Sequence, residues 1–334
     1  MELNNLIAAM QAEMELSIGC TEIGCAALAA ARASELLDGS PDRVQVEVSS
    51  YLYKNAANVC VPNTSLRGLG AALALGFILQ GSQDGLAILQ RANPSAEETA
   101  QQYLRAHTFE THIVNDGLPV FIRLTAQRAG RTALVEIAGE HSHFSEIRLD
   151  GNPLLIDPPT ATEGNHFAFQ GICPREMVDF IIAQDDQAFA FLVDQARINE
   201  AAAQTGLNDP GTSVGPSLHR HPRPADVILN AACQAQAQTA AASEARMLGL
   251  PVPVAALTGS GNHGITALLG MYSAAQALGA NQAQTARALA ITVMITIYVK
   301  HSTSRLTTFC GCAVAPAAGI AAGCVYLMGG GFET

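Results

Sequence analysis

The 334-residue sequence contains no tryptophan, only 5% aromatic residues and only 14% charged residues. Lysine and arginine total 18 against 29 acidic residues, which gives a net charge of −11 at pH 7. Binding to nucleic-acid phosphates requires clustered basic residues, so no nucleic acid is expected as a partner. The apolar share is 49%, enough to bury a large core, and the many Ala and Gly residues favour closely packed helices.

The first twenty residues lack the pattern of a secretion signal, which is a basic start followed by an apolar block. They carry Glu2, Glu13 and Glu15 instead, and the resulting prediction is a cytoplasmic location. Cysteines stay reduced in that compartment. The eight cysteines are therefore predicted to be buried thiols, catalytic thiols or metal ligands rather than a disulfide framework.

Residues 306–332, "LTTFCGCAVAPAAGIAAGCVYLMGGGF", contain no charged residue and are long enough to span a bilayer. They also contain Pro316 and several glycines, and they lack flanking basic clusters. We therefore predict no membrane span but a buried core helix packed through Ala and Gly, with Cys310 at its leading end. A membrane transport component is the alternative.

Apolar periodicity predicts an α+β fold, with a mainly α-helical catalytic body and a small antiparallel β-containing unit. The helical body is predicted to comprise residues 1–105 and 171–334. It includes one strand near residues 43–53, where valines alternate with polar residues. Short alternating runs separated by turn signals predict the β-rich unit over residues 106–170.

Within the body, residues 3–37 are predicted to form two helices that meet at Gly19, which places Cys20 at a helix start. The helix dipole would favour a thiolate at that position. The alternative is that Cys20 is simply a small residue in a tight turn. Residues 205–224 are rich in Gly, Pro and Ser, which predicts a loop or hinge.

Residues 258–267, "TGSGNHGITA", place Ser260, Asn262 and His263 among glycines just before an apolar helix. Backbone N–H groups at such a helix start favour an anion, so a carboxylate or a phosphate is a candidate ligand. A plain helix-capping turn is the alternative. The segment has the spacing of neither a P-loop nor a dinucleotide-binding motif.

In "SRLTTFCGCA", Arg305 precedes Cys310 by five residues and Cys312 follows two residues later. On a continuous helix the two cysteines would point about 200° apart, so only one is predicted to face a site unless Gly311 breaks the helix. The cysteine and histidine spacings do not favour zinc. The two histidines of "EHSH" (residues 140–143) are interpreted as part of a polar sheet surface.

The segment "GCTEIGCAALAAARA" resembles the "GCTEP" and following Ala-rich helix of the L-cysteine desulfidase family, which is related to the iron–sulfur L-serine dehydratase α chain. The resemblance continues in the same order through "KNAANVCVPNT", "SEARM", "GSGNHGITA", "RLTTFCGCA" and "GIAAGCVYLMGG". It covers nearly the whole chain, the β-rich middle being least similar. The family's "CDGA"-like motif would follow Thr334. Ile23 occupies the position of a Pro in the family, and His263 occupies the position of a Gln.

The resemblance implies an oxygen-sensitive 4Fe-4S cluster and a lyase of amino acid catabolism. Its reaction would be β-elimination of L-cysteine or L-serine to pyruvate and ammonia, with sulfide from cysteine. The implied partner is a small amino acid substrate, and a homodimer is the predicted assembly. A cluster-free family member that binds a small anion, or is inactive, is the alternative. The implied residues are Cys20 and Cys310 as iron ligands, Ser260, Gly261, Asn262 and Arg305 for substrate binding, and Lys54, Asn55 and His263 for proton transfer or amino-group recognition.

Overall fold

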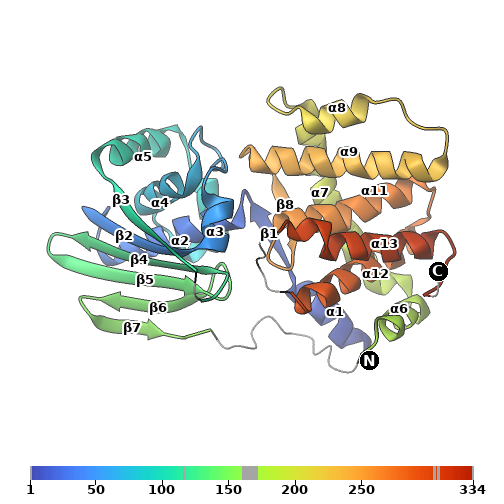
Figure 1. Ribbon diagram of the computed structural model, residues 1–334, viewed down its shortest axis with the longest axis horizontal. Coiled ribbons are helices and arrows are strands. Elements are labelled where there is room, and N and C mark those ends of the chain that lie inside the picture. Colours follow the sequence, from blue (N-terminus) through green and yellow to red (C-terminus); the bar gives the residue numbers. More distant parts are fainter. Residues whose placement is uncertain (1, 116, 160–171, 304–305, 307–308, 333–334) are drawn as a thin grey trace.

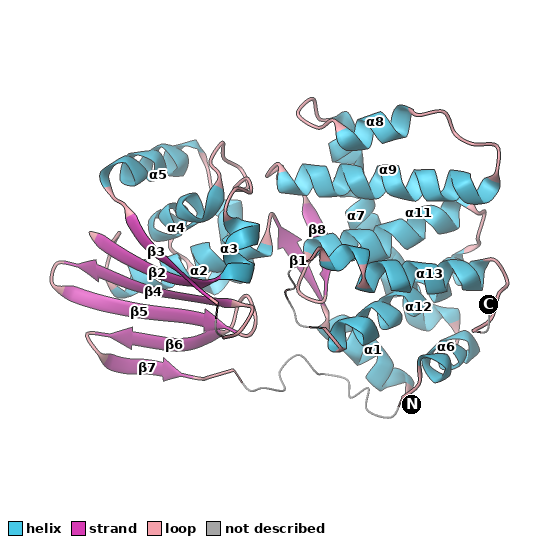
Figure 2. Ribbon diagram, in the orientation of Figure 1, coloured by secondary structure: helices cyan, strands magenta, loops and turns pink. Residues whose placement is uncertain are grey.

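The computed structural model describes residues 2–115, 117–159, 172–303, 306 and 309–332. Figure 1 shows two halves side by side, one built around a sheet and the other from packed helices. In Figure 2 the two short strands β1 and β8 border the helical half on the side that faces the sheet. The predicted α+β fold class is confirmed, whereas the predicted domain boundaries stay a prediction.

Within the described residues, the larger sheet has six strands in the order β3-β2-β4-β5-β6-β7. The predicted alternation is confirmed in its second strand, because Val44, Val46 and Val48 are buried while Gln45 is exposed. β2 and β3 run parallel, and the other neighbouring strands are antiparallel. The strands are β2 (Arg43–Ser49), β3 (Phe109–Val114), β4 (Phe121–Arg128), β5 (Arg131–Ala138), β6 (Phe144–Leu149) and β7 (Asn152–Ile156).

Ala-rich helices cover the buried face of this sheet. α2 (Thr21–Leu36) is buried along almost its whole length and contacts β4 and β5. It packs against α4 (Gly68–Leu79) so closely that a Cβ atom at Gly76 would lie 2.2 Å from the carbonyl oxygen of Ala27. The small residues therefore serve close helix contacts, as predicted. The other helices of this half are α3 (Ser50–Ala56), η1 (Ser82–Arg91) and α5 (Pro94–Ala106).

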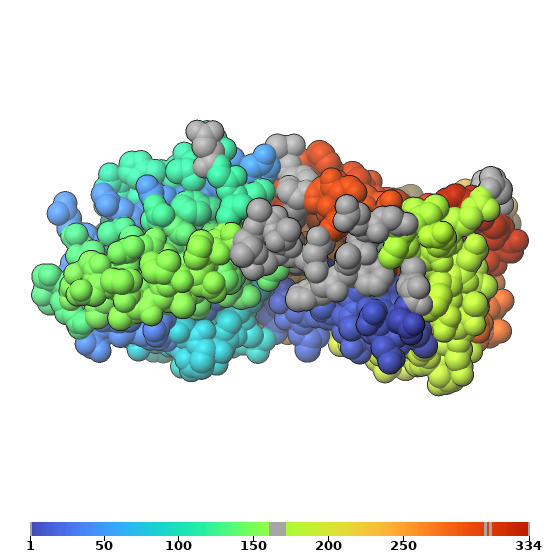
Figure 3. Space-filling model, turned by 90° about the horizontal axis from the view of Figure 1, so that it is seen from below, coloured from blue at the N-terminus to red at the C-terminus, as the bar shows by residue number. Residues whose placement is uncertain are grey.

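The helical half contains the first helix and the chain after residue 172. In Figure 3 the dark blue atoms of α1 (Leu3–Ala12) lie in the same half as the yellow-green segment that follows residue 172. This half has its own core, in which Leu6 and Met10 of α1 pack with Met271. Its later helices are α6 (Pro174–Ala183), η2 (Asp186–Phe189), α7 (Ala190–Asn208), α8 (Val214–Arg220), α9 (Val227–Met247), α10 (Gly261–Gly264), η3 (Ile265–Leu269), α11 (Gly270–Ala277), α12 (Gln282–His301), η4 (Gly311–Ala313) and α13 (Ala315–Leu327).

Residues Met14–Ile18 form strand β1, so the helix predicted for this stretch is wrong. Apolar residues four apart share one face of a strand as well as one face of a helix, which makes the pattern ambiguous. β1 pairs antiparallel with β8 (Pro253–Leu257), with Leu16 opposite Ala255. A partner strand far along the chain therefore decides the conformation of this segment.

Residues 205–224 are also more regular than predicted, because they include helix α8. Gly215 in this helix lies against α9, where a Cβ atom would come within 2.4 Å of Cα of Ala241. A glycine that favoured a loop in the sequence therefore permits a close contact between two helices.

The uncharged stretch 306–332 includes α13, which packs on α12. Ala315, Pro316, Gly319 and Gly323 are its buried residues, while Ala317, Ala318 and Ala321 are exposed. The prediction of a buried core helix is therefore wrong for one of its faces. In the described part of the chain, no single helix is long and apolar enough to cross a membrane, although α4 and η1 together meet that criterion across a bend of 112°.

Candidate active site

The segment around Cys20 contacts the loop that follows α3. Gly19 has a φ of 69°, and a Cβ atom there would lie 2.3 Å from Cγ of Pro62, so glycine is required. Asn55, in the last turn of α3, donates a hydrogen bond of 2.7 Å to Oε1 of Glu22. These contacts join "GCTE" to "KNAANVCVPNT".

The same loop reaches the residues that follow α9. The backbone N–H of Asn63 donates to the carbonyl oxygen of Gly249 at 3.3 Å. Near the end of α9, Arg246 of "SEARM" donates through Nη1 to Oδ1 of Asn262 at 3.0 Å. Arg246 therefore links α9 to the glycine-rich turn that follows β8.

The glycine-rich turn reverses the chain and leads into α10. The backbones of Leu257 and Ser260 exchange two hydrogen bonds of 3.1 Å, and α10 begins at Gly261, so Asn262 and His263 lie in the first turn of the helix rather than before it. Thr258 in this turn has a φ of 52°, a left-handed conformation that is unfavourable for a β-branched residue. Its hydroxyl oxygen lies 2.9 Å from Nδ1 of His263. The strained residue therefore holds the histidine ring.

His263 faces the "CGC" loop. A Cβ atom at Gly311 would lie 2.4 Å from Nε2 of His263, so the loop backbone passes close to that nitrogen. Burial and the neighbouring thiol of Cys310 raise the pKa of Cys312, which also hydrogen-bonds with Thr266. Because Cys310 precedes the short turn η4, the two thiols are neighbours rather than pointing apart. We refer to "GCTE", "KNAANVCVPNT", "SEARM", "GSGNHGITA" and "CGC", now linked by contacts, as the five motifs.

The thiol of Cys20 is held by an ionised carboxylate. Cys20 is the N-cap of α2, as predicted, and its Sγ donates to Oε2 of Glu22. Burial opposes ionisation of Glu22, but the charge of His141 and hydrogen bonds from Cys20 and Asn55 outweigh it and lower the pKa of the carboxyl. Burial and the charge of Glu22 raise the pKa of the Cys20 thiol, and Arg246 opposes this only in part. These surroundings favour the thiol over the thiolate expected at a helix start.

The other predicted site residues differ in their exposure. Lys54 is exposed on α3, and Cys310 is exposed ahead of η4. Ser260 and Asn262 are half-buried in the glycine-rich turn. Arg305 lies outside the described residues. The roles of all the predicted site residues stay predictions.

Comparison with known proteins identifies the family. The family model described as "Serine dehydratase alpha chain" matches residues 83–334. This chain belongs to the serine dehydratase alpha-chain family. Relatives named "UPF0597 protein" occur in Methanocella arvoryzae (34% identical, covering 100% of this chain and 78% of the relative), Oleidesulfovibrio alaskensis (33%, 99% and 78%) and Bacteroides thetaiotaomicron (32%, 99% and 78%). No solved structure matched the chain.

The resemblance stated from the motifs is thereby confirmed at the level of the serine dehydratase alpha-chain family. The iron–sulfur cluster that it implies needs a sufficient donor set, since a cubane cluster usually takes three or four protein ligands. In the part of the chain that the structure describes, no three His, Cys, Asp or Glu side chains gather to hold a metal. These residues alone do not fit a complete cluster site, so no reaction step is assigned to a cluster.

Three charged residues that received no role from the sequence lie among the five motifs or beside them. Glu22 belongs to "GCTE" and Arg246 belongs to "SEARM". A charged residue inside a matched motif was therefore the sequence signal that could have identified both as site residues. His141 is buried in the turn between β5 and β6, and its charge acts on Glu22. The interpretation of "EHSH" as polar sheet surface is therefore wrong for His141, and the tertiary contact alone reveals its position.

Glu244, the acidic residue of "SEARM", has a separate structural role. Its carboxylate accepts hydrogen bonds from the backbone N–H groups of Ser213, Val214 and Gly215 at 2.8, 2.9 and 3.1 Å. Burial opposes its ionisation, but these hydrogen bonds outweigh it and lower the pKa of the carboxyl. Glu244 therefore caps the N-terminal end of α8.

We expect Glu244→Gln to lower the free energy of unfolding by about 1 kcal/mol at neutral pH, because charge-assisted hydrogen bonds are lost at a solvent-screened position. Folding lowers the pKa of Glu244 from its usual 4.5. Its contribution is therefore present above that value and is lost as the pH falls through the folded-state pKa. Urea unfolding at neutral and acidic pH measures the difference. The exposed Glu98→Gln is the control, and a pH-independent effect of Glu244→Gln would contradict the prediction.

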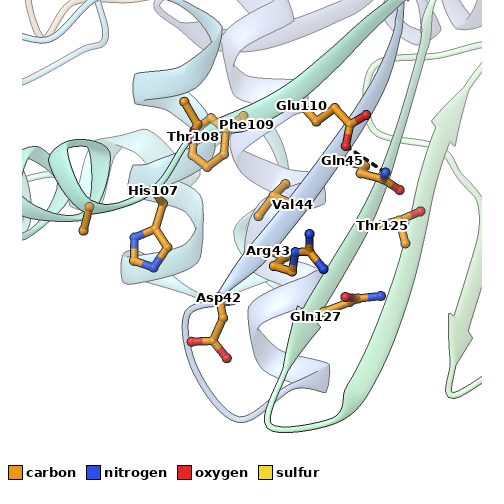
Figure 4. A pocket seen from close by; sticks show the side chains of 11 residues that line it. Asp42, Arg43, Val44, Gln45, His107, Thr108, Phe109, Glu110, Thr125 and Gln127 are labelled. Carbon is orange, nitrogen blue, oxygen red and sulfur yellow. Dashed lines mark hydrogen bonds between the residues drawn. The ribbon is translucent and has the colours of Figure 1, made fainter.

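Two cavities differ in their relation to the five motifs. In the sheet half, Figure 4 shows Gln45, Glu110 and Gln127 reaching from β2, β3 and β4 into a cavity of about 500 Å³. Gln45 donates to Glu110 there at 2.9 Å, and no lining residue belongs to the motifs. A cavity of about 180 Å³ touches Gly259, and its lining contains three carboxylates, those of Glu13, Glu15 and Glu140, and one histidine, His141, a balance that disfavours a carboxylate ligand.

Proposed function

We propose that this member of the serine dehydratase alpha-chain family eliminates the β-substituent of L-cysteine or L-serine. The products are pyruvate and ammonia, with hydrogen sulfide from cysteine. The supporting observation is the chain of contacts that links the five motifs, from Glu22 and Asn55 through Arg246 and Asn262 to His263 and Gly311. Active sites are commonly assembled from such separate segments held by a rigid scaffold.

The orientation of His263 suits proton transfer. The hydroxyl of Thr258 donates its single proton to the preceding backbone carbonyl at 2.7 Å, so it accepts from Nδ1–H of His263. In the neutral ring this leaves the lone pair on Nε2, which faces the loop at Gly311. Because the Asn55 amide is not a base and Lys54 is exposed, we propose His263 as the general base.

In the proposed reaction, Nε2 of His263 takes the proton from the α-carbon. The electron pair of the C–H bond forms the double bond between the α- and β-carbons. The bond from the β-carbon to sulfur or oxygen breaks with its electron pair, and the leaving group takes up a proton. The resulting aminoacrylate tautomerises and reacts with water to give pyruvate and ammonia.

The resemblance predicts an iron–sulfur cluster bound by Cys20 and Cys310, although the described residues do not gather a complete donor set for it. Anaerobic purification and reconstitution with iron and sulfide tests this part of the proposal. We expect a brown protein that contains iron and forms pyruvate from L-cysteine or L-serine. Iron-loaded protein that forms no pyruvate from either amino acid would refute the proposed reaction.

A second candidate function is the binding of a small anion without elimination. The observation that favours it is the donor set, because the described residues do not gather three metal-binding side chains. Protein that stays colourless and iron-free after anaerobic reconstitution, yet binds a small carboxylate, would support this function.

The cytoplasmic location and the homodimer also stay proposals. Light scattering of the purified protein tests the dimer.

A further inference from the structure

Arg246 is a buried cation without a partner of opposite charge among the described residues. The residue is 2% exposed, and none of the ion pairs in the described part of the chain includes it. Nη1 donates to Oδ1 of Asn262 at 3.0 Å and to Sδ of Met247 at 3.5 Å. Nε has no hydrogen-bond partner among the described residues. Burying a charge is strongly unfavourable unless an opposite charge compensates it.

The nearby acidic groups do not provide this compensation. Glu244, two residues earlier, is committed to the backbone of α8. The carboxylate of Glu22 accepts hydrogen bonds from Cys20 and Asn55, whereas the hydrogen bonds of Arg246 in the described part of the chain go to Met247 and Asn262. No carboxylate among the described residues therefore pairs directly with the guanidinium, which leaves this position to an anionic ligand.

The surroundings of Arg246 combine a fixed position with access from solvent. A Cβ atom at Gly261 would lie 2.5 Å from Nε and 2.7 Å from Cζ, so the guanidinium occupies space that a glycine leaves open. Asn262, which accepts a hydrogen bond from the guanidinium, is half-buried, so solvent reaches the residue beside it.

We infer that Arg246 binds the carboxylate of the substrate and selects amino acids over the corresponding amines. With Nη1 bonded to Asn262 and Met247 and Nε buried against Gly261, Nη2 is the nitrogen that would donate a charge-assisted hydrogen bond to the carboxylate. The hydrogen bond to Asn262 fixes the orientation of the group, and the same turn carries His263. This inference rests on the proposed function, since that function defines the substrate as an amino acid.

The test compares two fragments of serine by isothermal titration calorimetry. 3-Hydroxypropionate keeps the carboxylate and hydroxyl of serine, whereas ethanolamine lacks the carboxylate. Wild-type protein should bind 3-hydroxypropionate more tightly than ethanolamine. Arg246→Met should weaken the binding of 3-hydroxypropionate at least about 30-fold, Arg246→Lys should weaken it less, and the exposed Arg197→Met is the matched control.

Thermal unfolding separates binding from folding. Because Arg246→Met removes a buried, uncompensated charge, its melting temperature should equal or exceed that of the wild type. An unchanged affinity for 3-hydroxypropionate in Arg246→Met, or equal binding of ethanolamine by the wild type, overturns the inference. A large loss of melting temperature in both Arg246→Met and Arg246→Lys overturns it in favour of a structural role.

The same proteins distinguish this inference from the proposed function. If the wild type forms no pyruvate but binds 3-hydroxypropionate through Arg246, elimination is refuted and the carboxylate site stands. If Arg246→Met forms pyruvate with an unchanged KM, elimination stands and the assignment of Arg246 is refuted.

Discussion

Replacing His263 by asparagine is expected to lower kcat/KM for β-elimination by about 10²- to 10⁴-fold, the range that a general base contributes. The asparagine amide can still donate to the Thr258 hydroxyl, which lies 2.9 Å from Nδ1 in the native protein, whereas the basic Nε2 is lost. Pyruvate formation measures the effect. With substrate deuterated at the α-carbon, the kinetic isotope effect should increase because proton removal becomes slower relative to the other steps.

Two substitutions of Thr258 control for the position of the ring. Thr258→Ser keeps the hydroxyl and removes the β-branch that is unfavourable at a φ of 52°, so its activity should remain within a few-fold of the wild type. Thr258→Val keeps the shape but loses the acceptor for Nδ1–H, and its kcat/KM should fall by about tenfold. A nearly unchanged kcat/KM in His263→Asn would exclude His263 as the base.

Gly264→Ala is expected to destabilise the protein by about 3 kcal/mol, at the upper end for overpacking. Gly264 lies against β8, and a Cβ atom there would stand only 1.9 Å from the carbonyl oxygen of Ala255. That oxygen belongs to the strand backbone, so α10 must move away from β8. The shift in the urea unfolding midpoint measures this effect.

Gly270→Ala is the matched control because it lies further along the same helical segment. Its added Cβ atom would meet Cδ1 of Ile320 at 3.0 Å, the mobile end of a side chain. The gain in helix propensity, about 1 kcal/mol, offsets this contact, so we expect little change in stability. Equal destabilisation by both substitutions would show that the contact with β8 is not the cause.

Local sequence patterns predicted those elements whose conformation local chemistry decides. The Ala-rich run after Cys20 forms α2, and the alternating valines form β2. The segment Met14–Ile18 was predicted as helix but forms β1, because pairing with β8 satisfies its backbone. Residues 205–224 gave loop signals, yet Glu244 stabilises the start of α8 from another helix. In both cases a contact distant in sequence outweighs a weak local preference.

The candidate site was predicted as a set of residues but not as an arrangement. The motifs identified Cys20, Asn55 and His263, and the contacts now join the segments that carry them. The motifs did not reveal that Thr258 is the partner of His263 or that Arg246 is buried. A sequence pattern records residue types and spacing, whereas a hydrogen bond depends on distance and direction between groups far apart in the chain.

By itself, the sequence determined the α+β class, the family and most of the helices, because helix formation, strand alternation and glycine turns depend on neighbouring residues. The tertiary structure alone decided that Glu22 is ionised beside a protonated Cys20, that Thr258 orients His263, and that Arg246 is buried without a counter-ion among the described residues. Protonation states and charge compensation depend on burial and on the groups nearby in space, and folding alone brings these groups together.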